Sequence, residues 1–162
     1  MATDFKSLSR NDQGALITGA LAVIFTFIGS YITVSVKVTG FNQSAGHNAW
    51  DGWGSFASLL LILALAVVVV RIFAAANLPD GVPWNLIAFA LAALGTVILI
   101  IKGLTFGPDV PSIAQSSVDA GVGWSGWVLF VLAIAFSVFS FLAFKDSGEQ
   151  VPEINKQTPP AV

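Results

Sequence analysis

The sequence predicts an all-α integral membrane protein in which four transmembrane helices form a bundle. The chain has 162 residues, of which 56% are hydrophobic and 10% are charged, and its mean hydropathy is +0.83. Because a soluble domain carries about 25% charged residues, this composition points to lipid as the surrounding solvent. The chain also contains apolar segments of about 20 residues, the length that a helix needs to cross the hydrocarbon core. Tryptophans and cations stand at the ends of these segments.

The chain opens with a short polar segment, residues 1–14, which we expect to be a cytoplasmic tail. Asn11 or Asp12 is suited to cap the helix that follows. The first predicted span covers residues 15–36. Its positively charged start resembles a signal peptide, but the apolar run exceeds the ~7–15 residues of a signal core, so we interpret it as a retained helix.

Small residues gather along one side of this first span when it is drawn as a helix. Gly19 and Ala22 share that side with Thr18, Thr26 and Thr33. Small side chains let helix backbones approach closely in lipid, and hydroxyls can hydrogen-bond across helices. The favoured interpretation is helix packing through Gly19 and Ala22. The alternative is that the threonines line a pore.

The second span, residues 55–73, follows a loop predicted for residues 37–54 and carries Arg71 near its end. Within that loop, His47 lies four residues before Asp51. Two candidate ligands make a poor metal site. We therefore predict neither a bound metal nor a cofactor.

The third span is predicted for residues 84–101. The connection before it contains the turn sequence Leu-Pro-Asp-Gly at residues 78–81, so the second and third helices should form an antiparallel hairpin. Ala88 and Ala92 stand at four-residue spacing and indicate another packing face. Lys102 is expected to extend outward from the end of this helix.

The fourth span is predicted for residues 124–144, and its many phenylalanines should face lipid or pack against other helices. The preceding segment, residues 103–123, contains prolines and glycines that argue against a long regular element. Residues 145–162 are polar and include three prolines. We expect them to form a flexible cytoplasmic tail.

The distribution of cations predicts the orientation in the membrane. If both termini are cytoplasmic, five of the seven cations lie inside and only Lys37 and Lys102 lie outside. The five are Lys6, Arg10, Arg71, Lys145 and Lys156. Because lysine and arginine are retained on the cytoplasmic side, both termini are predicted to be cytoplasmic.

Five tryptophans mark the two membrane interfaces in this arrangement. Trp50, Trp53, Trp124 and Trp127 would form an outer belt, and Trp84 would mark the inner interface. We expect all five to act as interface anchors. The Trp-x-Gly-Trp motif begins at residue 50 and again at residue 124, which suggests two parallel helix-hairpin repeats.

The entry to the second span, Asn48-Ala-Trp-Asp-Gly-Trp53, lies on a cysteine-free chain rich in alanine and valine. In these features the chain resembles small four-helix membrane proteins of actinobacteria, whose function is unknown. The resemblance implies a multi-pass protein of the bacterial plasma membrane. It implies no activity and no catalytic residues.

The placement of charge also limits the function. No charged residue lies in the middle of a predicted span, cysteine is absent, and the single histidine lies in a loop, so an enzyme is not expected. The net charge of −2 gives no basic surface for nucleic acid. We expect a non-catalytic structural or accessory subunit that assembles with itself or with a larger membrane complex. The alternative is an oligomeric channel or passive pore for a small solute or ion.

Overall fold

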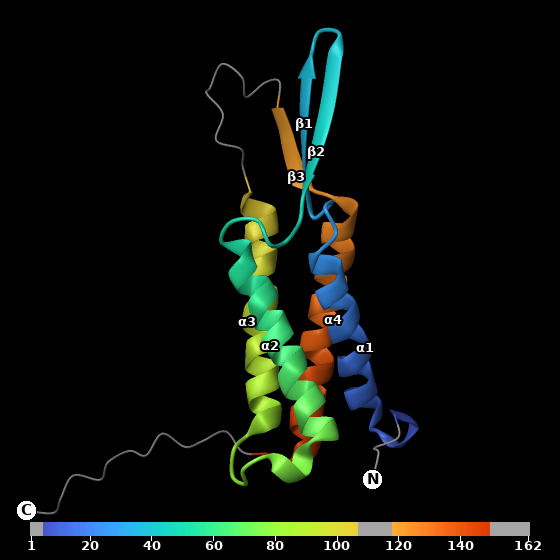
Figure 1. Cartoon of the computed structure of the whole chain (residues 1–162), viewed down its shortest axis with the longest axis vertical. Helices are drawn as coiled ribbons and strands as arrows, with labels where there is room; N and C mark the ends of the chain where they lie inside the picture. Colours follow the sequence, from blue (N-terminus) through green and yellow to red (C-terminus); the bar gives the residue numbers. More distant parts are fainter. Residues whose placement is uncertain (1–4, 107–117, 150–162) are drawn as a thin grey trace, which may run out of the picture.

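A computed structural model of the chain describes residues 5–106 and 118–149. The middle of the predicted second loop and most of the predicted C-terminal tail lie outside these residues. The described residues form four α-helices, two short 3-10 helices and three strands (Figure 1). In chain order these are η1 Phe5–Ser7, α1 Arg10–Thr26, β1 Ile32–Val38, β2 Phe41–His47, α2 Gly54–Phe73, η2 Ala75–Asn77, α3 Trp84–Thr105, β3 Val118–Val122 and α4 Trp124–Ser147.

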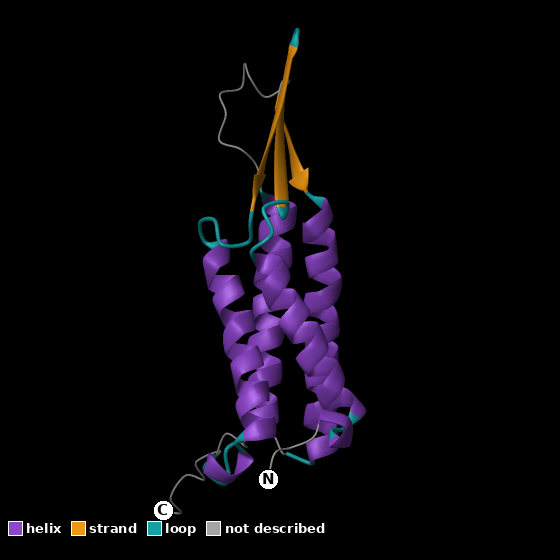
Figure 2. Cartoon of the chain, turned by 45° about the vertical axis from the view of Figure 1, so that its right-hand side comes forward, coloured by secondary structure: helices purple, strands orange, loops and turns teal. Residues whose placement is uncertain are grey.

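The four α-helices lie side by side along one axis (Figures 1 and 2). Helix α1 packs against α2 and α4, and α3 packs against the same two helices. Helix α1 begins and α4 ends at the same end of the bundle, together with the α2–α3 connection. We call this the far end, and we call the opposite end, from which the strands extend, the sheet end.

A small antiparallel sheet extends from the sheet end, so the all-α prediction is wrong in this respect (Figure 2). The strand order is β2-β1-β3, and the strands run roughly along the axis of the bundle. A two-residue turn joins β1 to β2, and its Gly40 has a φ of 82°, a conformation that a glycine adopts without steric cost. The segments predicted as two irregular loops therefore contain β2 and β3.

The first predicted span is also wrong in its extent, because the helix ends at Thr26 and residues 32–38 form a strand. Beyond Gly29 and Ser30 the sequence alternates apolar and polar residues, and this period of two favours a strand. The helix begins before residue 15, because Ser9 and not Asn11 or Asp12 caps it. The Ser9 hydroxyl accepts a hydrogen bond from the Asp12 backbone N–H at 3.1 Å.

The other three predicted spans correspond to helices close to their predicted positions. Within the described residues, α2, α3 and α4 are the helices long and apolar enough to cross a membrane, whereas α1 has 17 residues. Helix α3 continues to Thr105 and α4 to Ser147, which is beyond the predicted ends. The predicted antiparallel hairpin of α2 and α3 is present, and Gly81 in its turn has a φ of 81°.

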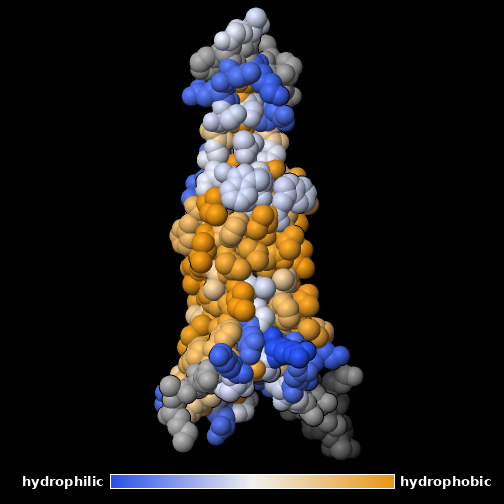
Figure 3. Space-filling view, turned by 90° about the vertical axis from the view of Figure 1, so that its right-hand side faces the viewer, coloured by the Kyte–Doolittle hydropathy of each residue, from blue (hydrophilic) through white to orange (hydrophobic). Residues whose placement is uncertain are grey.

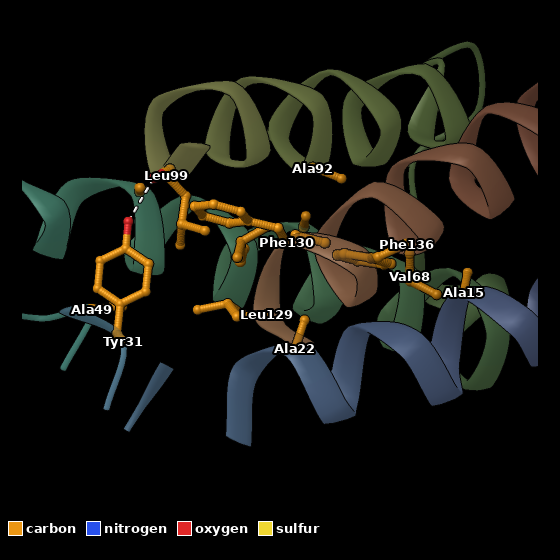
Figure 4. Packing of buried hydrophobic residues seen from close by; sticks show 14 of the residues in the cluster. Ala15, Ala22, Tyr31, Ala49, Val68, Ala92, Leu99, Leu129, Phe130 and Phe136 are labelled. Atoms are coloured by element: carbon orange, nitrogen blue, oxygen red, sulfur yellow. Dashed lines mark hydrogen bonds between the residues drawn. The ribbon is translucent and has the colours of Figure 1, made fainter. Parts of the chain in front are cut away.

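The buried cluster of the described residues combines eight alanines with eight larger hydrophobic residues (Figure 4). Phe136 of α4 is fully buried, with Ala15 and Ala22 of α1 in the same cluster. Many other large aliphatic side chains lie on the outside, where Leu104 is 62% and Val131 is 67% exposed. On the face seen in Figure 3, an apolar band covers the helices between two more hydrophilic ends. A continuous apolar surface of this kind is suited to lipid contact.

Polar contacts close the far end of the bundle. Arg71 of α2 forms an ion pair with Asp12 of α1. Glu149 follows the end of α4 and accepts hydrogen bonds from the backbone N–H groups of Asn85 and Leu86. These N–H groups belong to the first turn of α3 and have no acceptor within the helix, so Glu149 caps α3.

Candidate functional site

Several polar contacts meet at the junction between the sheet and the helices. Tyr31, which precedes β1, is fully buried, and its hydroxyl donates to the Leu99 carbonyl of α3 at 2.5 Å (Figure 4). Its ring contacts Phe130 of α4 edge-on, with the centroids 6.2 Å apart. Its own carbonyl accepts from the N–H of Gly123, which precedes α4, at 3.0 Å. Tyr31 therefore ties the base of β1 to two helices.

Burial raises the pKa of the Tyr31 hydroxyl above its ordinary value. A backbone hydrogen bond from Gly103 acts in the opposite direction and is the smaller effect. The hydroxyl is therefore protonated at physiological pH and remains the donor to Leu99.

Lys102 lies inside this junction, which corrects the prediction that it extends outward. It is 4% exposed, and its ammonium donates to the Asp51 carbonyl and lies 5.5 Å from the Tyr31 ring centroid. Any side chain at Gly54, the first residue of α2, would overlap Lys102. The prediction failed because α3 continues for almost one turn beyond Lys102 and turns this residue toward α2.

His47 and Asp51 form a hydrogen-bonded pair on the surface of the same junction. The His47 Nδ1 and Asp51 Oδ2 atoms are 3.0 Å apart, and both side chains are about half exposed. The pair connects the end of β2 to the loop that enters α2. No group of three or more histidine, cysteine, aspartate or glutamate residues suited to a metal ion occurs in the described part of the chain.

The predicted tryptophan anchors fall into two groups. Trp53, Trp124 and Trp127 are each more than half exposed at the sheet end. Trp50 is half-buried and its Nε1–H donates to the Thr26 hydroxyl at 3.0 Å, so it fastens the loop to the end of α1.

Trp84 begins α3 at the far end and is half-buried. The two Trp-x-Gly-Trp motifs also differ in conformation. The first precedes α2, which starts at Gly54, whereas the second forms the first turn of α4. In each half a strand precedes the motif and a helix follows it, but the first half has two strands, and the conformation of the motif differs.

The four predicted packing positions all face the interior. Ala22, Ala88 and Ala92 are at most 2% exposed. Gly19 is buried, and a Cβ atom added there would lie 2.8 Å from Cε2 of Phe136. These positions are occupied by contacts within the chain, which leaves none of them on the outer surface for another protein.

The threonines of the first predicted span do not form one helical stripe. The Thr18 hydroxyl donates to the Gly14 carbonyl at 2.7 Å. Thr26 is fully buried in the junction, and Thr33 lies in β1 rather than in the helix. The three threonines therefore do not lie on one helix, and the stripe that suggested a pore lining is absent from the described residues.

The sheet is the surface that sequence reasoning missed. Its register places mostly apolar residues on one face and polar residues with two glycines on the other. The mostly apolar face carries Ile32, Val34, Val36, Ala45, Val118, Ala120 and Val122, together with Gln43 and His47. The polar face carries Thr33, Ser35, Lys37, Asn42, Ser44 and Asp119. The alternation in residues 32–38 was the signal that could have revealed this element.

Strand β2 forms one edge of the sheet. In the part of the chain that the structure describes, it is paired with β1 alone. The strand contains no proline and no Asp, Glu, Lys or Arg, and it pairs with β1 without interruption over seven residues. Natural edge strands usually carry charges, prolines or bulges that prevent pairing with other chains. The edge of β2 lacks these features.

Comparison with known proteins does not assign this chain to a group. No protein-family model matches the sequence, and no curated protein matches it significantly.

Proposed function

We propose that the protein is a non-catalytic, multi-pass accessory subunit of a larger complex in the bacterial plasma membrane. The observation that carries this proposal is the sheet at the sheet end, with β2 as an unprotected edge. The helices hold the chain in the bilayer, and the sheet extends beyond them. The small-residue faces support the bundle rather than the assembly, because all four named positions are buried within the chain.

An edge strand can recognise a partner by adding the partner's strand to the sheet. Alternate residues of an edge strand direct their backbone N–H and C=O groups outward. Ser35 of β1 and Ser44 of β2 are directly opposed, and their hydroxyls lie 3.0 Å apart. Such a short separation is typical of opposed residues that exchange no backbone hydrogen bonds with each other. We therefore expect the N–H of Ser44 to face away from β1 and toward a partner strand.

Geometry favours a different protein over a second copy as the partner of β2. An antiparallel pair of two β2 strands requires a two-fold axis perpendicular to the strands. The strands run along the bundle axis, so this operation would point the two bundles in opposite directions (Figure 2). Two copies inserted in the same bilayer with the same orientation cannot satisfy it.

The partner can be tested by purification in a mild detergent followed by native mass spectrometry. We expect a second protein to accompany the wild type and the Ser44→Ala variant. Ser44→Pro should release it, because proline removes the outward N–H while both variants lack the serine hydroxyl. A chain that is monomeric without partners in cells and in nanodiscs would contradict the accessory role. A purified homomeric ring that conducts ions in a planar bilayer would instead support the channel alternative.

The proposed orientation places both termini and the α2–α3 connection in the cytoplasm. Arg10, Arg71 and Lys145 lie at the far end of the bundle, and Lys37 lies in the sheet. Since the chain lacks cysteine, single cysteines can be introduced for labelling. A membrane-impermeant thiol reagent should label Gln43→Cys but not Asn77→Cys in intact spheroplasts. Both residues are exposed at opposite ends, so the reverse labelling pattern would show the opposite orientation.

A further inference from the structure

A second surface feature lies on the lipid-facing side of α3 and α4. A groove of about 230 Å³ is lined by Phe89, Ser137, Val138 and Phe141. The rings of Phe89 and Phe141 are 5.1 Å apart between centroids. The Ser137 hydroxyl donates to the Ala133 carbonyl at 3.0 Å, so its polar group is satisfied within α4. The groove therefore presents an apolar surface in the half of the bundle near the far end.

A cation, Lys145, lies beside this groove, four residues after Phe141 on α4. Lys145 is exposed, and its ammonium lies 5.9 Å from the centroid of the Phe141 ring. The two residues are four positions apart, a rise of about 6 Å along a helix. No ion pair of Lys145 occurs among the described residues. The Lys145 ammonium is thus free to contact the headgroup of a lipid whose acyl chain lies in the groove.

We propose that the groove binds an anionic phospholipid, with one acyl chain against Phe89, Val138 and Phe141 and the phosphate on Lys145. The apolar lining fits a hydrocarbon chain, and the ammonium fits the negative charge that follows it at the interface. The inference uses the membrane location of the proposed function but not its protein partner.

The two carboxylates that follow Lys145 are held by hydrogen bonds from other helices, whereas the Lys145 ammonium lies beside a ring that lines the groove. Asp146 accepts a hydrogen bond from the Asn11 side chain at 2.5 Å. Glu149 accepts from the first turn of α3 and caps it. Both carboxylates therefore have donors from other helices.

A second apolar groove gives a useful contrast. It lies between α2 and the start of α3, and its lining includes Val70, Leu78 and Trp84. The turn beside it carries Asp80, and in the described part of the chain no lysine lies over the Trp84 ring as Lys145 lies over Phe141. The proposed lipid preference is therefore specific to the groove of α3 and α4.

For the test, the full chain is reconstituted in nanodiscs of equal parts phosphatidylglycerol and phosphatidylcholine. The protein is then released from the nanodiscs in the mass spectrometer, and the lipids that remain bound to it are counted. We expect preferential retention of phosphatidylglycerol by the wild type. Lys145→Gln should reduce that preference roughly fivefold, and Lys145→Arg should preserve it. Val138→Phe fills the groove and should reduce retention of the bound lipid itself. The matched controls Arg10→Gln and Val131→Phe change an exposed cation and an exposed valine elsewhere and should behave as wild type.

Two results would overturn the lipid site. One is an unchanged phosphatidylglycerol preference in Lys145→Gln, and the other is wild-type lipid retention in Val138→Phe. Both substitutions are at exposed positions, so the bundle should remain folded. A chain that failed to enter nanodiscs would contradict the membrane location, whereas entry without lipid preference would contradict this inference alone.

Discussion

Tyr31→Ala is expected to lower the free energy of unfolding by roughly 3–5 kcal/mol, as for other large aromatic side chains truncated in a core. Tyr31 is fully buried and contacts Phe130, Leu99 and the Lys102 ammonium. Its removal would leave a cavity below β1 and an unsupported cation. The sheet should therefore separate from the helices before the bundle unfolds.

Tyr31→Phe provides the matched control, because it removes only the hydroxyl. The expected loss is about 0.5–1.5 kcal/mol, the net value of one hydrogen bond. Stability can be measured by titration with denaturing detergent, and separation of the sheet by hydrogen exchange at the amides of β1. Equal stability of the two variants would show that the ring does not connect the sheet to the helices.

Helices α2, α3 and α4 could be predicted from sequence because each contains a long, uninterrupted apolar run. The turn between α2 and α3 could be predicted because proline and glycine restrict the backbone in a known way. Gly81 has the positive φ that such a turn requires. These are local properties, and a single sequence contains them in full.

The end of α1 could not be located because two patterns follow one another in one apolar stretch. Residues 15–28 and the strand Ile32–Val38 are both hydrophobic, so hydropathy alone joins them. The period of two in the second part was visible but was outweighed by the expected span length. The pairing of β1 with β3 depends on helices that bring residues 32 and 122 together, and no local pattern encodes it.

The burial of Lys102 shows a similar limit. Ala88, Ala92, Gly95 and Leu99 follow each other at spacings of four and three residues, and Lys102 is the next position in that series. Extending the series would have placed the lysine on the buried face of α3. The prediction instead assumed that the helix ended there, and a charge at a helix end was expected to reach water.

Gly19→Leu should distinguish packing of the fold from packing against a partner. A Cβ atom at Gly19 would lie 2.8 Å from Cε2 of Phe136 and 3.1 Å from Cδ1 of Leu65, so a leucine must displace α1 from both α4 and α2. Overpacking of this kind costs about 1–3 kcal/mol or more. Ala20→Leu is the matched control, because Ala20 is the next residue of the same helix and is exposed.

The free energy of unfolding in detergent should therefore fall for Gly19→Leu and remain near wild type for Ala20→Leu. Phe136→Ala alone should also destabilise the bundle, by roughly 3–5 kcal/mol, because it opens a cavity. In the double variant the leucine can occupy part of that cavity, so the two losses should sum to less than their separate values. If Gly19→Leu were as stable as wild type but lost its protein partner, this face of α1 would bind the partner and the sheet would not be the assembly surface.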